Sequence, residues 1–214
     1  MSARGCFITF EGPDGSGKST QAGRLADRLR ATGLGVLSVR EPGGTDTGER
    51  IRQLVQHTPS QESLCAEAET LLFAASRAQL TRQLVLPALA AGTWVVCDRY
   101  ADSTAVYQGY GRGMDLDAIR AINRMATADT EPDLTLLVDV TVETGQRRRA
   151  ARHAGEAAAY DRMENQARDF HERVRAGYLA WARQFPARIR TVDGERDADA
   201  VAQEIWTMTK AQLL

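Results

Sequence analysis

The residues best suited to chemistry lie near the start of the chain, in a glycine-rich segment. Residues 12–19 match the pattern Gly-x-x-x-x-Gly-Lys-Ser of a phosphate-binding loop. The glycines allow the backbone N–H groups to point inward, and a helix starting near Lys18 would direct its positive end to the same place. The Lys18 ammonium would bridge the β- and γ-phosphates of ATP, and the Ser19 hydroxyl would bind Mg²⁺. The predicted nucleotide-binding residues are Gly12, Pro13, Asp14, Gly15, Ser16, Gly17, Lys18, Ser19 and Thr20.

The context of this motif argues against a chance glycine-rich turn. An apolar run at residues 6–10 precedes it and predicts a buried strand, and a helical pattern of apolar residues follows it. Of the 27 Lys and Arg residues in the chain, only Lys18 and Lys210 are lysines. One of the two therefore stands where a compact ammonium suits the ligand better than a broad guanidinium.

A second pair of candidate residues, Asp98 and Arg99, follows the apolar run at residues 94–97. A carboxylate at the end of a strand beside the phosphate loop can hold Mg²⁺ directly or through water. The Arg99 guanidinium has the forked geometry that suits a phosphate group. A salt bridge at the strand end is the alternative interpretation, but ligands bind at the ends of such strands.

The elements that must position these residues alternate between strand and helix. Apolar runs predict strands at 6–10, 36–39, 94–98, 134–140 and 189–192. Helices are expected at 19–32, around 51–55, and at 62–86, 115–126, 143–152, 161–185 and 197–213, with Pro87 kinking or ending the third. Residues 100–114 are expected to form a loop with irregular helix. This pattern predicts an α/β fold of the P-loop NTPase class: a central five-stranded parallel sheet with helices on both faces and a short lid.

Composition limits the possible classes of protein. The chain has 214 residues, is 43% hydrophobic and 26% charged, and carries a net charge of −1, so we expect one domain over residues 1–214 and neither a nucleic-acid nor a membrane surface. No apolar run approaches the roughly 20 residues of a spanning helix, and the N-terminal segment has no signal-peptide pattern. Three scattered cysteines suit a reducing cytoplasm. The three histidines show no ligand spacing and are expected at the surface.

Missing motifs narrow the class further. The chain has no Asn-Lys-x-Asp motif of a GTPase and no Leu-Ser-Gly-Gly-Gln signature of a transport ATPase, and its phosphate loop lacks the early second lysine of partitioning ATPases. Small phosphoryl-transfer enzymes remain. A kinase for another nucleotide or for a deoxynucleoside stays open at this point, as does an ATP-dependent switch protein.

An ordered set of motifs selects one family among these enzymes. They are the segments 11–20, 40–45 (Arg-Glu-Pro-Gly-Gly-Thr), 72–77 (Leu-Phe-Ala-Ala-Ser-Arg), 98–100 (Asp-Arg-Tyr), 103–109, 132–135 (Pro-Asp-Leu-Thr) and 161–164 (Asp-Arg-Met-Glu). In this order the chain resembles the bacterial thymidylate kinases. The resemblance implies transfer of the γ-phosphoryl of ATP to dTMP, giving dTDP and ADP in dTTP synthesis, in a homodimeric nucleoside monophosphate kinase.

The resemblance also implies roles for residues that could bind dTMP. Phe73 and Arg77 are four residues apart and share a helix face; in the family the ring stacks on thymine and the guanidinium donates to its O4. Arg99 would hold the dTMP phosphate, and Asp14 would contact the 3′-hydroxyl or a nearby arginine. A segment that reads the base and crowds the sugar, with the tyrosine favouring deoxyribose, comprises Ser103, Thr104, Tyr107 and Gln108.

A dense cluster of arginines marks the expected lid at 147–160. Arg147, Arg148, Arg149 and Arg152 would repel one another on a solvated helix, and an anion would relieve that repulsion. Some thymidylate kinases carry a catalytic arginine in the phosphate loop and others supply it from the lid. Residues 12–19 contain no arginine, so the chain resembles the second type, with Arg149 and Arg152 as the candidates. Residues 192–194 end the last strand and are expected near the adenine.

Overall fold

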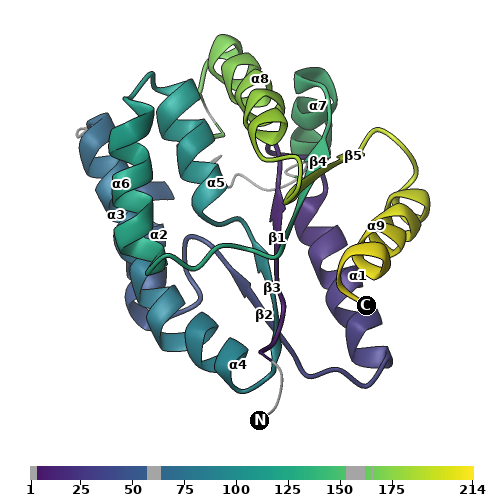
Figure 1. The fold of residues 1–214 in the computed structure, drawn as a ribbon. Coiled ribbons are helices and arrows are strands. Elements are labelled where there is room, and N and C mark those ends of the chain that lie inside the picture. The colour runs from purple at the N-terminus through teal and green to yellow at the C-terminus, as the bar shows by residue number, and fades with distance from the viewer. Residues whose placement is uncertain (1–3, 57–63, 153–161, 165) are drawn as a thin grey trace.

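The computed structural model describes residues 4–56, 64–152, 162–164 and 166–214. In this part of the chain, five parallel strands form one sheet in the order β2-β3-β1-β4-β5 (Figure 1). The strands are β1 (Phe7–Glu11), β2 (Val36–Arg40), β3 (Trp94–Asp98), β4 (Leu134–Asp139) and β5 (Ile189–Asp193). The predicted five-stranded parallel sheet is therefore confirmed.

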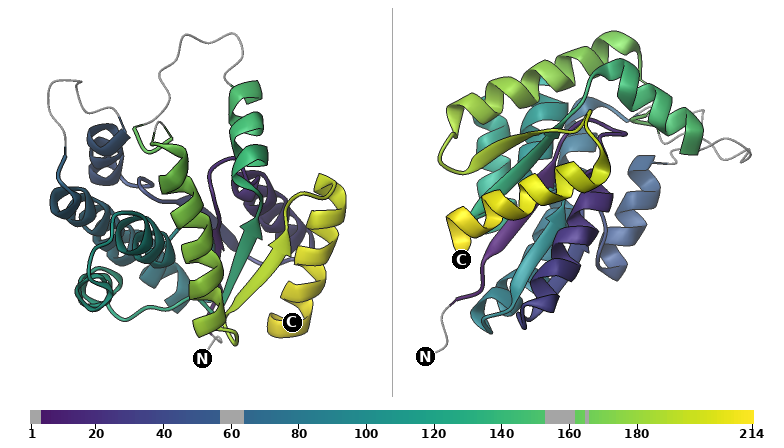
Figure 2. Two further views of the ribbon diagram at one scale, coloured as in Figure 1. Left: turned by 90° about the horizontal axis from the view of Figure 1, so that it is seen from above. Right: turned by 90° about the vertical axis from the view of Figure 1, so that its right-hand side faces the viewer.

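Helices cover both faces of this sheet, and the central strands are accordingly apolar on both sides. On one face, Ile8 and Phe10 of β1 pack with helices α1 (Lys18–Ala31) and α9 (Ala198–Leu213), which lie side by side (Figure 2). On the other face, Phe7 packs with Leu80 and Val85. Neighbouring residues of a strand point to opposite faces, so both sets must be apolar when both faces are covered.

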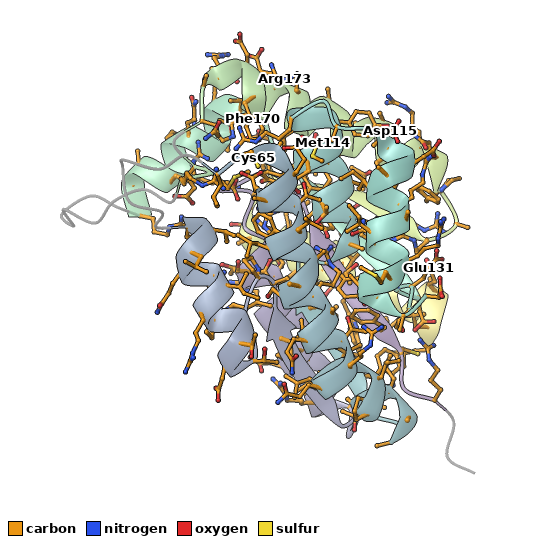
Figure 3. The ribbon with its side chains drawn as sticks, turned by 90° about the vertical axis from the view of Figure 1, so that its left-hand side faces the viewer. Cys65, Met114, Asp115, Glu131, Phe170 and Arg173 are labelled. Carbon is orange, nitrogen blue, oxygen red and sulfur yellow. The ribbon has the colours of Figure 1, made fainter. Side chains whose placement is uncertain are left out.

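The helices of the second face come from the middle of the chain. They are α2 (Asp46–Gln56), α3 (Ala66–Leu80), α4 (Leu86–Ala90), α5 (Ala101–Thr104), α6 (Leu116–Thr127) and α8 (Arg168–Gln184), with α7 (Val142–Arg152) beyond the end of β4. Helix α6 packs beside α3; in Figure 3, Asp115 marks the start of α6, Glu131 lies in the loop that follows its end, and Cys65 marks the start of α3. Within the described residues, no helix is both long and apolar enough to cross a membrane.

Several helix boundaries differ from the prediction. The helix expected from residue 62 begins at Ala66, and two further differences have a visible cause. The helix expected to kink or end at Pro87 continues to Ala90 through a π-helical turn, η1 (Thr81–Val85), in which the Leu86 N–H bonds to the carbonyl of Thr81. The regular bonding pattern is thus already interrupted before Pro87, so the missing N–H of the proline does not end the helix.

The helix expected from residue 161 begins only at Arg168. The Arg162 N–H bonds to the Gln56 carbonyl, and its side chain bonds to the Val55 carbonyl. These bonds tie residues 162–164 to the end of α2, and a contact of this kind between distant segments leaves no periodic signal in the sequence. Residues 153–161, most of the expected lid, lie outside the described residues.

Other local predictions are confirmed. The Asp115 carboxylate accepts a hydrogen bond from the Ala118 N–H, which makes it the N-cap expected for α6. The irregular segment expected at 100–114 is α5 followed by a second π-helical segment, η2 (Ala105–Gly111). One histidine prediction is wrong: His171 is buried, because α8 packs against α7 and the His171 ring lies against the Glu164 carbonyl.

Candidate active site

The carboxyl ends of the strands bring the chemically capable residues to one edge of the sheet. Asp98 at the end of β3 is in register with Phe10 of β1 and with Arg40 of β2, and Asp139 of β4 is in register with Asp193 of β5. The phosphate loop leaves β1 at this same edge. A cavity of about 310 Å³ opens here, between the loop and helix α3.

The phosphate loop has the backbone conformation that its glycines predict. Gly12 and Gly15 have φ of 143° and 82°, and a Cβ on Gly15 would lie 2.4 Å from the Gly145 carbonyl oxygen. Only glycine fits these positions. Helix α1 begins directly after Gly17, without a side-chain cap and without an acidic residue in its first turn. Its N-terminal N–H groups are therefore left for an anion.

The Lys18 ammonium lies folded back over the loop. Its Nζ donates to the Pro13 carbonyl at 3.3 Å and lies 3.7 Å from Asp14 Oδ1. Burial lowers the pKa of Lys18, and the neighbouring Arg99 lowers it further, against the opposing effect of nearby carboxylates. A phosphate bound to the loop would replace the weak Pro13 contact with a charge-assisted one.

Ser19 and Asp98 meet as a metal site requires. The Ser19 hydroxyl donates to Asp98 Oδ2, while Asp98 Oδ1 is buried and has no hydrogen-bond partner among the described residues. A buried carboxylate oxygen without a hydrogen-bond donor is suited to bind a cation or cation-bound water. The two residues predicted to bind Mg²⁺ thus fit a magnesium site next to the phosphate loop.

Arg99 lies at the centre of the cavity wall, in a left-handed conformation with φ of 70°. Such a conformation costs a non-glycine residue about 1–2 kcal/mol, and here it turns the side chain toward the phosphate loop. The guanidinium donates to Asp14, to the Gly12 carbonyl at 3.2 Å and to the hydroxyl of Tyr107 at 3.1 Å. Arg99 thus joins the phosphate loop to η2.

Asp14 faces this arginine, so its placement in a phosphate loop has an electrostatic explanation. Its other oxygen accepts from the Tyr107 hydroxyl at 2.8 Å. Burial would raise the pKa of the Asp14 carboxyl, but Arg99, Lys18 and the Tyr107 hydrogen bond outweigh burial and lower the pKa. Asp14 therefore stays ionised and orients both Arg99 and Tyr107.

Two further residues of this cluster, Glu11 and Tyr178, are absent from the predicted site. The Glu11 carboxylate is buried and accepts from the backbone N–H of Tyr100 at 2.8 Å, from the Ser103 hydroxyl at 2.6 Å and from the Tyr178 hydroxyl at 2.8 Å. Burial raises the pKa of Glu11, and the nearby Asp102 adds to that effect. Glu11 could have been identified from the sequence, because it is a charged residue at the end of an otherwise apolar strand. Tyr178 could not, because it has the spacing of an ordinary core residue on α8.

The far end of the cavity is formed by Phe73 and Arg77, which both line it, as their shared helix face predicted. Phe73 is half-buried, whereas Arg77 is only 1% exposed. The Arg77 Nε donates to Glu41 Oε2 at 2.8 Å. Burial raises the pKa of Glu41 to about 7, although Arg77 opposes that effect. Glu41 is a second buried acid that the sequence pattern did not indicate as a site residue.

The segment at 103–108 closes the side of the cavity. Thr104 accepts from Arg77 at 2.9 Å, and the Gln108 amide donates to Glu69 at 2.8 Å. Ser103 bonds to both Arg99 and Glu11. These three residues and Tyr107 all line the cavity, so the structure brings together every residue predicted for the acceptor site.

The arginine cluster on α7 divides into separate environments. Arg152 lines the cavity and donates to Glu164 at 2.8 Å. Arg149 is buried, and its Nε and Nη1 have no partner among the described residues. Arg148 donates to the carbonyl of Gly194 at 3.0 Å, and Arg147 is exposed. Arg148 also reaches the Ser16 carbonyl of the phosphate loop at 3.5 Å, but its guanidinium is already bonded to two carbonyls, whereas Arg149 has nitrogens without partners in the described residues and Arg152 borders the cavity.

This fold and site define a phosphate-loop phosphotransferase with an acceptor cavity beside the loop. The family model for thymidylate kinase matches residues 10–205. The chain is 49% identical to the thymidylate kinase of Thermomicrobium roseum over 94% of this chain and 92% of that protein. It is 45% identical to that of Syntrophotalea carbinolica (97% and 96% covered) and 47% identical to that of Alcanivorax borkumensis (94% and 94% covered). The chain belongs to the thymidylate kinase family.

Proposed function

We propose that this chain transfers the γ-phosphoryl group of ATP to dTMP, forming dTDP and ADP in dTTP synthesis. The observation that carries this proposal is one cavity that is lined both by residues of the phosphate loop and by Arg99, Phe73 and Arg77. The phosphates of ATP would bind at the loop, the phosphate of the acceptor at Arg99 and the base of the acceptor at Phe73. These positions suit a nucleoside triphosphate and a nucleoside monophosphate bound together.

The reaction needs charge neutralisation more than proton transfer. The dTMP phosphate has a second pKa of about 6 and is mostly dianionic at neutral pH, so it can attack without a general base. A bond forms between its oxygen and the γ-phosphorus of ATP, and the bond to the β–γ bridging oxygen breaks. The barrier comes from bringing two anions together. Lys18 and Arg99 would neutralise this charge and align the reacting groups.

Ser19 and Asp98 would hold Mg²⁺, as the unpartnered Asp98 Oδ1 supports. The ion would neutralise charge on the β- and γ-phosphates of ATP. Arg148 bonds to the Ser16 carbonyl of the phosphate loop and to the Gly194 carbonyl, so the loop and the end of β5 are neighbours. We place the adenine beside residues 192–194.

The acceptor end of the cavity fits thymine and deoxyribose. Phe73 would stack on the base, and Arg77 would donate to O4. Thr104 and Gln108 would complete the base site. The Tyr107 hydroxyl bonds to Asp14 and Arg99, which fixes the tyrosine ring in the cavity wall. In our proposal this ring would exclude a 2′-hydroxyl and so favour deoxyribose. Asp14, which orients Arg99, would face the 3′-hydroxyl side of the sugar.

A substrate panel tests the proposal. ADP release should be fastest with dTMP, slower with dUMP and near background with dCMP, AMP and GMP. A kinase acting on a deoxynucleoside would respond to thymidine and not to dTMP. A switch protein would hydrolyse ATP at the same slow rate with or without dTMP. Equal rates with all five nucleotides would refute the proposal.

We also propose that the chain acts as a homodimer of single-domain subunits in the cytoplasm. Three large apolar side chains, Leu54, Leu71 and Met125, are 54–70% exposed on helices α2, α3 and α6, of which α3 contacts the other two. Such a patch favours a second protein surface. The cysteines at 6, 65 and 97 are free thiols, which suits a reducing compartment.

The dimer proposal predicts that Leu71→Glu shifts the sedimenting species from dimer to monomer, because two buried carboxylates would face each other across a symmetric interface. Thr207→Glu, on the exposed side of α9, is the matched control and should leave the mass unchanged. A wild-type protein that sediments as a monomer at micromolar concentration would contradict the proposal.

A further inference from the structure

Asn123 on helix α6 contacts the arginine that we assign to base reading. Its Oδ1 accepts from Arg77 Nη1 at 2.8 Å, and its Nδ2 donates to the Ala101 carbonyl at 3.0 Å. The Asn123 amide must have its oxygen toward Arg77 and its nitrogen toward Ala101, since a guanidinium needs an acceptor and a carbonyl needs a donor. Asn123 does not line the acceptor cavity. It lines a second cavity of about 350 Å³ behind Ala101.

The hydrogen bonds of Arg77 leave one N–H for a ligand. A guanidinium carries five N–H groups. Nε donates to Glu41, and Nη2 donates to the Tyr100 carbonyl at 3.2 Å and to Thr104 at 2.9 Å. Nη1 donates to Asn123. Within the described residues, the remaining N–H is the second one on Nη1, and Arg77 borders the acceptor cavity.

Because both N–H groups of Nη1 lie in the guanidinium plane, the bond to Asn123 sets the direction of the other. Glu41, Tyr100 and Thr104 hold the edge of the group that carries Nε and Nη2, and within the described residues Asn123 is the one contact at Nη1 that stops the plane from rotating about that edge. We infer that Asn123 is a positioning residue for base selection: it aims the remaining Nη1 N–H of Arg77 at position 4 of the pyrimidine. This inference rests on the proposed dTMP kinase activity.

The consequence for specificity follows from base chemistry. Thymine presents a carbonyl acceptor at position 4, whereas cytosine presents an amino donor. A firmly aimed N–H favours the acceptor and rejects the donor. A guanidinium that can rotate would turn the N–H away and meet cytosine without a donor–donor clash. Losing Asn123 should therefore weaken selection for dTMP over dCMP more than it slows phosphoryl transfer, which takes place at the other end of the cavity.

The test compares three variants in steady-state assays with dTMP and dCMP. Asn123→Leu keeps the volume but removes the acceptor, and should raise KM for dTMP about 10-fold, as expected for a lost hydrogen bond to a charged group. Its kcat should stay within about 2-fold, and the dTMP-over-dCMP ratio of kcat/KM should fall about 10-fold. Asn123→Asp keeps an acceptor for Arg77 and should retain the selectivity. Arg124→Ala, on the same helix and the same second cavity, should behave as wild type.

A double-mutant cycle separates positioning from support of the fold. In an Arg77→Ala background, Asn123→Leu should have no further effect on KM or on selectivity. An Asn123→Leu effect of the same size in that background would overturn the inference, as would unchanged selectivity in the single variant. If Asn123→Leu does not fold, loss of selectivity in the folded Asn123→Asp variant would overturn it. A wild-type enzyme without a preference for dTMP would instead refute the proposed function itself.

Discussion

Replacing Arg99 by alanine should lower kcat/KM for dTMP by about 10³-fold, equivalent to about 4 kcal/mol of transition-state stabilisation. Arg99 is the cation between the phosphate loop and the acceptor cavity, and its fork can hold the acceptor phosphate in two parallel hydrogen bonds. It also compensates Asp14: without Arg99, this half-buried carboxylate loses its ion pair with the guanidinium, keeps the longer one with Lys18, and competes with the phosphates for that ammonium.

Two comparisons make this prediction specific. Arg99→Lys should recover only a small part of the activity, because an ammonium cannot reproduce the fork that reaches Asp14, Gly12 and Tyr107 together. Arg24→Ala removes an exposed ion pair with Asp199 and should change kcat/KM less than 2-fold, as is usual for surface pairs. Steady-state kinetics with dTMP and ATP varied in turn would measure these values. A loss below 10-fold for Arg99→Ala would exclude Arg99 as the acceptor-phosphate ligand.

The parts of the site that the sequence predicted are those encoded by short segments. The phosphate loop could be identified because Gly12–Ser19 forms the whole cradle within eight residues, between one strand and one helix. Asp98 and Arg99 could be placed because parallel strands end at one edge of the sheet. Phe73 and Arg77 could be paired because a helix puts residues four apart on one face.

The remaining site residues depend on contacts between distant segments, which local patterns do not encode. The burial of Glu11 is explained only by the hydrogen bonds that it accepts from Tyr100, Ser103 and Tyr178, which come from other parts of the chain. Asn123 sits in an amphipathic helix where it looks like an ordinary solvated residue. The late start of α8 has the same origin, because bonds to the end of α2 hold residues 162–164.

Replacing Arg152 by alanine should lower kcat by about 10³-fold while KM for dTMP changes less than about 3-fold. The phosphate loop supplies no arginine, so the charge that develops on the transferred phosphoryl group must be met by another cation, and an arginine in this role is worth 10³ or more in kcat. Arg152 comes from the helix that leads into the expected lid, and it lines the cavity. A residue that acts only on the transition state affects kcat and leaves substrate binding nearly unchanged.

Arg149 is the second candidate, and its own variant distinguishes the two. A buried guanidinium with two nitrogens left without partners in the described part of the chain is costly unless an anion binds it. If that anion is a phosphate group of ATP, Arg149→Ala should raise KM for ATP and lower kcat by a smaller factor than Arg152→Ala. Arg147→Ala is the matched control, because Arg147 is exposed on the same helix. Equal losses of dTMP affinity in both variants would show that these arginines bind dTMP and do not act in phosphoryl transfer. Binding of the substrate ground state would then account for the whole effect of each variant.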